Sequence, residues 1–152
     1  MERSQILKRI LVTGASGQLG LSLQDIAPQY SDLEFLFKKS TELDITDEEK
    51  VNNIFKTGRF DYCINCAAYT KVEEAEKNPE MAFKVNAEAV RYLAEACTIQ
   101  NTTLIHISTD FVFDGAKTTP YTEEDLPNPI NVYGKSKWEG EKYIQEILDK
   151  YY

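Results

Sequence analysis

The sequence has few of the residues that mark membrane proteins, metal sites or disulfide scaffolds. Its 152 residues include one histidine and three cysteines. No apolar run approaches the roughly 18 residues that a membrane span requires. Three cysteines suit a reducing compartment, and Met1–Gln5 leads directly into a strand pattern instead of a signal peptide. We therefore expect a cytoplasmic protein outside the membrane, and we assign no metal ligands.

Basic residues are also scarce relative to acidic ones. The chain has 17 Lys and Arg against 25 Asp and Glu, which gives a net charge of −8. This balance excludes bulk attraction to nucleic acid or anionic lipid. An anionic ligand would instead have to be bound locally, by helix termini and a few basic side chains. The content of 42% hydrophobic and 28% charged residues is typical of one globular domain.

The rare residue types are better explained by packing than by chemistry. Cys63 and Cys66 have the spacing of a redox motif, but their segment has the pattern of a strand. A strand would put the two Cα atoms ~10 Å apart on opposite faces, too far for a disulfide. We interpret them as packing cysteines. His106 lies in the apolar segment 104–107, which favours a packed or partnered core histidine over a catalytic base or metal ligand.

Strand and helix patterns alternate along the whole chain. The predicted strands are residues 8–13, 33–37, 42–43, 60–67 and 103–108. The predicted helices are residues 18–27, a segment that Thr46 caps and that ends at Gly58, residues 79–100, and residues 131–148. Residues 114–130 have the composition of a loop.

This alternation predicts an α/β fold with a Rossmann-like, doubly wound parallel sheet in the strand order 3-2-1-4-5. No strand pattern follows the last helix, so the fold is expected to be truncated within its repeating pattern. Residues 1–152 would then form an incomplete NAD(P)-binding domain, with a C-terminal substrate domain absent. A naturally short protein is the alternative.

A glycine-rich loop follows the first strand. Gly14, Gly17 and Gly20 open a helix and differ from G-x-G-x-x-G by one extra residue in the first gap. Such glycines permit positive φ, let backbone amides approach a pyrophosphate, and let helix and strand pack closely. The loop therefore predicts a dinucleotide site. A helix-opening turn with incidental glycines is the alternative.

The residues after the second and third strands bear on cofactor choice. An acid after the second strand would bind the ribose 2′-hydroxyl of NAD, but this chain has Lys38 and Lys39 there. Two cations could pair with a 2′-phosphate, which favours NADP, or could be solvated loop residues. Asp44 could accept a hydrogen bond from adenine or simply begin a turn before Thr46. The small side chains at 67–68 would let a cofactor ribose lie against the backbone.

The last helix carries a candidate proton donor. Tyr133 and Lys137 share one helix face through their four-residue spacing. A tyrosine pKa of ~10 is too high for efficient proton transfer at neutral pH, and an adjacent ammonium lowers it. The lysine could also orient a nicotinamide ribose, and Thr109 could hydrogen-bond the substrate oxygen. Together with the glycine loop, this pair predicts a nicotinamide-dependent carbonyl reductase.

In this order the motifs resemble those of the extended short-chain dehydrogenase/reductases, and more narrowly the N-terminal half of the dTDP-4-dehydrorhamnose reductases. The resemblance covers about residues 7–150. It rests on T-G-A-x-G-Q-L-G at 13–20, E-L-D-I at 42–45, N-C-A-A-Y-T-x-V-E-x-A-E at 65–76, H-I-S-T-D-F-V-F-D-G at 106–115 and N-V-Y-G-K-S-K-x-x-G-E at 131–141.

The resemblance implies NADPH-dependent reduction of the C4 keto group of dTDP-4-dehydro-L-rhamnose to dTDP-L-rhamnose, with NADH as the other cofactor to consider. It implies Tyr133 as general acid, Lys137 as its partner on the ribose, and Thr109 as the third catalytic residue. Thr109 and Asp110 would contact the sugar. The implied cofactor-binding residues are Gly14, Gly17, Gln18, Leu19, Gly20, Lys38, Lys39, Asp44, Ile45, Ala67, Ala68, Tyr69, Tyr133 and Lys137. Lys38 and Lys39 depart from the acid that many relatives have.

Two other functions stay open at this point. One is an NAD-dependent sugar-nucleotide epimerase or dehydratase, which keeps its cofactor bound through each turnover. The other is a non-catalytic NADP-binding regulatory subunit, against which the intact set of Thr109, Tyr133 and Lys137 argues. The expected partners are a dTDP-sugar and, in the full-length enzyme, a second copy in a homodimer, with no nucleic acid and no membrane.

Overall fold

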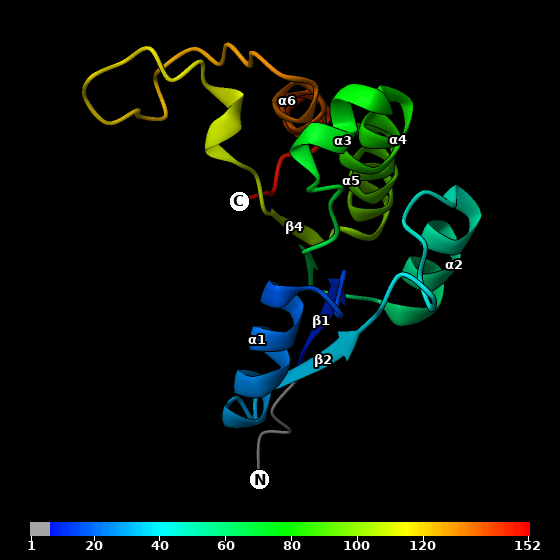
Figure 1. The fold of residues 1–152 in the computed structure, drawn as a ribbon. Coiled ribbons are helices and arrows are strands. Elements are labelled where there is room, and N and C mark those ends of the chain that lie inside the picture. The colour runs from blue at the N-terminus through cyan, green and yellow to red at the C-terminus, as the bar shows by residue number, and fades with distance from the viewer. Residues whose placement is uncertain (1–6) are drawn as a thin grey trace, which may run out of the picture.

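The computed structural model describes residues 7–152 and contains a four-stranded parallel sheet in the order β2-β1-β3-β4 (Figure 1). The strands are β1 (Lys8–Thr13), β2 (Leu33–Phe37), β3 (Tyr62–Asn65) and β4 (Thr103–His106). The α-helices are α1 (Gln18–Ile26), α2 (Glu48–Gly58), α3 (Val72–Lys77), α4 (Pro79–Phe83), α5 (Ala89–Gln100) and α6 (Val132–Ile147). Met1–Gln5, predicted to be a lead into β1, lies outside the described residues.

The predicted α/β class and parallel sheet are confirmed, with one error in the strand list. Residues 42–43 form no strand, so the predicted order loses its edge member and the remaining four strands keep their places. Instead, the amides of Glu42 and Leu43 both donate to the Lys39 carbonyl at 2.9 Å, which closes a turn. Leu43 is still only 3% exposed, because the turn points its side chain into the core.

Helices cover both faces of the sheet, with α1 on the side opposite α2 and α5 (Figure 1). The main core lies between the sheet and the layer of α2, α5 and α6. It is built from apolar side chains of all these elements, among them Leu11, Phe55, Leu93, Leu104 and Ile144. Burial on both faces explains the unbroken apolar run of β1. In the part of the chain that the structure describes, no helix is long and apolar enough to cross a membrane.

The helix predicted at 79–100 is interrupted by a π-helical segment, η2 (Lys84–Glu88), between α4 and α5. Such insertions into helices frequently occur at functional sites. The short helix α3 was not predicted. It has six residues with acids in its first turn, and the Asn78 side chain caps α4 immediately after it.

The chain returns to the sheet after α6, where the sequence predicts no further strand. Tyr151 forms a parallel bridge with Leu104, and the Tyr152 amide donates to the Leu104 carbonyl at 2.9 Å. The His106 amide donates to the Tyr152 carbonyl at 2.9 Å. The last residues therefore pair with β4. The pattern was missed because three residues are too few to show periodicity.

The start predicted for α6 is confirmed, whereas the cap predicted for α2 is wrong. Asp47, not Thr46, caps α2, because its side chain accepts from the Lys50 amide at 3.1 Å. Thr46 is occupied elsewhere, since its hydroxyl donates to Asp44 at 2.7 Å. α6 begins after Asn131 as predicted, with the Asn131 side chain accepting from the Gly134 amide at 2.7 Å.

The Asn131 cap gives a stability prediction for the helix that carries the candidate proton donor. Asn131→Ala removes the acceptor of the Gly134 amide, so the free energy of unfolding should fall by about 1 kcal/mol. Urea denaturation measures the loss. Asn131→Ser is the matched control, because serine is also a good N-cap. If the serine variant were as unstable as the alanine variant, the N-cap hydrogen bond would contribute nothing to the free energy of unfolding.

Candidate active site

The glycine loop passes directly against the strand end of β3. Gly14 has φ +62°, and a Cβ on it would lie 2.5 Å from the Ala67 nitrogen. A Cβ on Gly20 would lie 2.6 Å from the Ala15 Cα, so α1 packs tightly on its own loop. Only glycine permits both the left-handed turn and these approaches. Gly14 and Gly20 are therefore required by the local packing of the loop.

The first turn of α1 leaves its backbone amides available for a ligand. Gly17 is the N-cap, and no side chain caps the helix there. The Leu21 amide is the first to bond within the helix, donating to the Gly17 carbonyl at 2.9 Å. The amides of Gln18, Leu19 and Gly20 precede it. A helix N-terminus with unpaired N–H groups and a positive dipole end suits a pyrophosphate.

A cavity of about 280 Å³ opens beside this helix end. It is lined by six of the predicted cofactor residues: Gly14, Gly17, Asp44, Ile45, Ala67 and Ala68. Six further lining residues were not predicted: Ser16, Ser40, Leu43, Thr46, Cys66 and Val85. Three of these six, Ser16, Ser40 and Cys66, follow a strand end within three residues, a signal that could have identified them. Gln18, Leu19, Gly20, Lys38, Lys39 and Tyr69 do not line it.

Lys38 and Lys39 differ in their surroundings. The Lys38 amide donates to the Val12 carbonyl at 2.8 Å, and its carbonyl accepts from the Ala15 amide, which holds its backbone beside the glycine loop. Its ammonium lies 3.8 Å from a Glu42 carboxylate oxygen. The side chain of Lys39 is exposed, and its backbone amide donates to Glu42. Lys39 is thus the more accessible cation for an anionic ligand.

Asp44 fits both of its predicted roles in part. Its Oδ1 accepts from the Thr46 amide at 3.0 Å and from the Thr46 hydroxyl at 2.7 Å, so the residue does begin a turn. It also lines the cavity, next to the buried Ile45. An adenine amino group would have to use the other carboxylate oxygen.

Tyr133 is fixed by apolar packing at the start of α6. It is 9% exposed and packs with Ala75 of α3 and Ala82 of α4. The Phe111 ring meets it edge-on, with ring centroids 5.6 Å apart. Phe111 belongs to the 3₁₀ turn η3 (Asp110–Val112), which directly follows Thr109. This contact brings the strand end after β4 to the candidate proton donor.

Lys137 is buried at the same strand end. It is 2% exposed, and its ammonium donates to the Ile107 carbonyl at 2.6 Å, two residues before Thr109. Burial lowers the pKa of Lys137 to about 8, and the carboxylate of Glu141 opposes this shift. Tyr133 and Lys137 of α6 therefore contact Phe111 and Ile107, the residues two positions on either side of Thr109.

Asp110 lines a second cavity, and Thr109 directly precedes it. The Thr109 hydroxyl accepts from the Phe111 amide at 3.2 Å and lies 3.3 Å from the Asp110 carboxylate, to which it donates. Asp110 lines a cavity of about 270 Å³ together with Phe111, Phe113, Tyr121 and Ile130. Apolar and aromatic walls with two carboxylates, Asp110 and Asp114, suit a small polar ligand that presents an apolar face.

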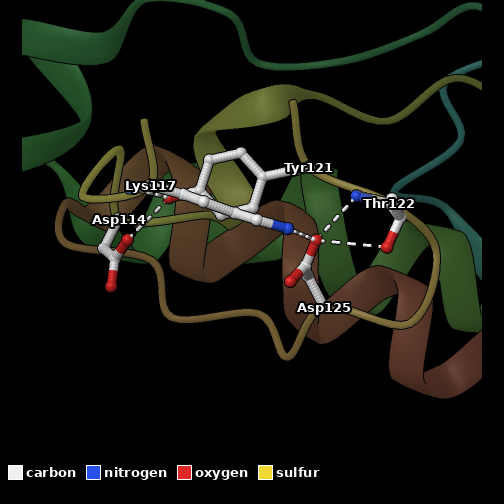
Figure 2. Close-up of polar contacts among 5 residues, drawn as sticks. All are labelled: Asp114, Lys117, Tyr121, Thr122 and Asp125. Carbon is white, nitrogen blue, oxygen red and sulfur yellow. Dashed lines mark hydrogen bonds and ion pairs between the residues drawn. The ribbon is translucent and has the colours of Figure 1, made fainter. Parts of the chain in front are cut away.

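The loop predicted at 114–130 has no helix or strand, yet it is cross-linked by polar contacts (Figure 2). The Tyr121 hydroxyl donates to Asp114 at 2.8 Å. Lys117 pairs with Asp125 at 2.6 Å, and the same carboxylate accepts from the Thr122 amide at 2.7 Å. The Phe113 and Tyr121 rings also stack, with centroids 4.2 Å apart. These contacts hold one wall of the second cavity.

Asn86 is a positioning residue that sequence reasoning missed. It is buried in the π-helical segment, where its side chain accepts from the Tyr69 amide at 2.8 Å and donates to the Tyr69 carbonyl at 2.9 Å. It also donates to the Ser136 hydroxyl at 3.0 Å. Asn86 therefore ties the loop after β3 to α6. The sequence feature that could have identified Asn86 is its place as a polar residue next to the apolar stripe of the helix.

The rare residues behave largely as the sequence predicts. Cys63, Cys66 and Cys97 are free, and the first and last are buried while Cys66 is half-buried. His106 is a partnered core residue, since Nδ1 lies 3.1 Å from the Asn65 amide nitrogen and Nε2 lies 3.4 Å from the Lys137 ammonium.

A parallel sheet, a glycine loop that leads into α1 and a buried tyrosine–lysine pair on α6 define a Rossmann-like α/β protein. The chain belongs to the family described as the RmlD substrate binding domain, whose model matches residues 8–152. The resemblance found in the sequence motifs is confirmed.

Relatives in this family are similar over nearly the whole chain. A dTDP-4-dehydrorhamnose reductase of Aggregatibacter actinomycetemcomitans is 43% identical over 144 residues, 95% of this chain and 49% of the relative. One of Sinorhizobium fredii is 44% identical, over 88% of this chain and 44% of the relative. A crystal structure of dTDP-4-dehydrorhamnose reductase from Bacillus anthracis in complex with NADP has a TM-score of 0.91 and 39% identity, covering 95% of this chain and 51% of that one. The chain thus spans about half the length of the curated relatives it matches.

Proposed function

We propose that this chain is the cofactor-binding part of an NADPH-dependent reductase that converts dTDP-4-dehydro-L-rhamnose to dTDP-L-rhamnose. The observation that carries the proposal is the buried pair Tyr133 and Lys137 beside Thr109, at the sheet edge that also holds the glycine loop. The names of the relatives and the NADP in the Bacillus anthracis structure support the substrate and the cofactor.

The residues present fit a dinucleotide. Gly14 and Gly17 line the cavity, and the amides of Gln18 and Leu19 at the start of α1 would donate to a pyrophosphate placed there. Asp44 and Ile45 would hold the adenine, and Ala67, Ala68 and Tyr69 would border the nicotinamide half. When bound, NADPH would supply the hydride.

Three side chains of this chain would then handle the substrate oxygen. Tyr133 would donate a proton to the C4 carbonyl oxygen as the hydride arrives at carbon. Lys137, mostly protonated at pH 7 with a pKa of about 8, would stabilise the phenolate left behind and hold the ribose. The Thr109 hydroxyl would hydrogen-bond the same oxygen, and Asp110 would contact the sugar. The remaining sugar-nucleotide contacts would come from the other half of such an enzyme. A cytoplasmic location and a homodimer stay predictions.

A single assay separates the reductase from the epimerase or dehydratase. The chain is joined to the C-terminal half of the Bacillus anthracis relative and incubated with dTDP-4-dehydro-6-deoxy sugars and NADPH. A reductase consumes NADPH in proportion to product, seen as loss of absorbance at the nicotinamide band. Sugar conversion without net loss of NADPH would contradict the proposal and favour an epimerase or dehydratase. Cofactor binding with no conversion would favour the regulatory subunit.

Cofactor preference can be tested on the chain itself. We expect NADPH to bind more tightly than NADH, because Lys38 and Lys39 can contact the 2′-phosphate. Replacing both lysines with glutamine should weaken NADPH binding by roughly 1–2 kcal/mol if one charge-assisted contact is lost. NADH is the internal control in the same calorimetric titrations. Equal weakening of both cofactors, or of neither, would show that the lysines are solvated loop residues.

A further inference from the structure

A line of side chains connects the ends of three strands to Lys137. The Thr13 hydroxyl of β1 donates to Asn65 Oδ1 of β3 at 2.6 Å, and Asn65 Nδ2 lies 3.1 Å from His106 Nδ1 of β4. His106 Nε2 in turn lies 3.4 Å from Lys137 Nζ of α6. Thr13 and Asn65 are 0% and 1% exposed, so this line runs through the interior beneath the candidate active site.

The hydrogen bonds of Asn65 determine which nitrogen of His106 carries the proton. Asn65 Oδ1 accepts from the Thr13 hydroxyl and from the Ala67 amide at 3.2 Å. The other end of the amide, Nδ2, therefore faces His106, and an amide nitrogen only donates. His106 Nδ1 must accept this bond. A neutral imidazole that accepts at Nδ1 carries its proton on Nε2.

This tautomer places an N–H group opposite the lysine. An ammonium has no lone pair, so His106 Nε2–H can bond only to the neutral amine of Lys137. The Ile107 carbonyl and the Glu141 carboxylate act in the other direction, because both favour the ammonium. The other titratable groups on this side are Tyr133, one turn away on α6, and Tyr151 and Tyr152, which line a cavity with His106 and Glu141.

We propose that His106 is a positioning residue for Lys137, held by Asn65 as the neutral Nε2–H tautomer so that its N–H opposes the charged form of the lysine. The link to catalysis rests on the proposed function, whereas the network itself does not. The pKa values agree with the geometry: burial and then the charge of Lys137 lower the pKa of His106 to about 3. In this arrangement His106 lowers the pKa of Lys137, so that the ammonium releases a proton more readily.

The tautomer can be observed directly, because His106 is the only histidine of the chain. Two-bond ¹H–¹⁵N correlation spectra of the uniformly ¹⁵N-labelled chain contain a single imidazole. The expected result is a neutral Nε2–H ring that does not become imidazolium between pH 8 and pH 5. An Nδ1–H tautomer, or titration near pH 6.5, would overturn the proposal. The measurement needs neither cofactor nor substrate, so a failure of the proposed reductase activity would not affect it.

The coupling to Lys137 is tested with two substitutions on α6. Lys137→Met removes the positive charge beside the ring, so the pKa of His106 should rise. Lys135→Met is the matched control, because Lys135 is exposed on the same helix, and it should leave His106 unchanged. Equal behaviour of the two variants would overturn the coupling.

A final measurement follows the lysine itself. With ¹³C at lysine Cε, one resonance should titrate near pH 8 and vanish in Lys137→Met. His106→Asn keeps an acceptor near the position of Nδ1 but removes the Nε2–H, so this midpoint should rise by at least half a pH unit. An unchanged midpoint would contradict the proposed role. If His106→Asn does not fold, the tautomer of the unmodified chain decides.

Discussion

Tyr133→Phe should lower carbonyl reduction by ~100- to 10,000-fold, the range that general acid catalysis typically contributes. The phenylalanine ring keeps the contacts with Phe111, Ala75 and Ala82, so the fold and NADPH binding should survive. Only the proton donor is lost. The rate is measured by NADPH consumption in the enzyme joined to the Bacillus anthracis half, alongside NADPH affinity of the chain alone.

A second substitution, at Lys137, distinguishes the role of this lysine from that of the proton donor Tyr133. Lys137→Met should lower the rate and also shift its pH dependence, because the lysine acts partly through the tyrosine. If Tyr133→Phe kept near-normal reduction at pH 7 with intact cofactor binding, Tyr133 would not be the donor. A water molecule or a relay through Thr109 would then have to replace it.

Gly14→Ala should destabilise the chain by roughly 2–6 kcal/mol. A non-glycine residue at positive φ costs of order 1–3 kcal/mol, and forcing a Cβ against packed neighbours costs typically 1–3 kcal/mol more. The second cost applies here because the Cβ would meet the backbone of Ala67, which cannot rotate away. Cofactor binding should weaken at the same time, since Gly14 lines the cavity. Urea denaturation and NADPH titration measure the two effects.

Gly115→Ala is the matched control for this clash. Gly115 also has positive φ, at +73°, but a Cβ at that position would have no neighbouring atom within 4 Å. It should therefore lose only the conformational part, about 1–3 kcal/mol. Equal losses at the two glycines would show that the approach to Ala67 is unimportant.

The sequence predicts the fold well where periodicity and burial coincide. Four strands and the order in which they pair are correct, because Ile10, Leu11 and Val12 could only be a buried strand. At Glu42 and Leu43 the pattern misleads. The Leu43 side chain is buried, but the amides of both residues bond to the Lys39 carbonyl in a turn instead of to a neighbouring strand. A pattern of buried side chains does not show which groups the backbone amides and carbonyls hydrogen-bond to.

For the candidate site, residues on strand ends and helix faces were predictable, and contacts across elements were not. Local spacing identified Tyr133, Lys137 and the glycine loop. The role of Asn86 depends on the π-helical segment, which turns its amide toward Tyr69 and Ser136. The tautomer of His106 depends on Asn65, more than forty positions away in sequence. Such pairings arise from the topology of the sheet.

The braced loop between η3 and α6 has a thermodynamic consequence. Flexible lids lose conformational entropy when they close on a ligand, and this loss reduces affinity. Here Asp114 and Asp125 hold the side chains of Tyr121 and Lys117 within the loop (Figure 2). The loop that forms this wall of the second cavity is therefore ordered by its own contacts. A ligand that binds there would remove little further conformational entropy from the loop. A ligand that fits it would be selected by shape, with little adjustment of the loop.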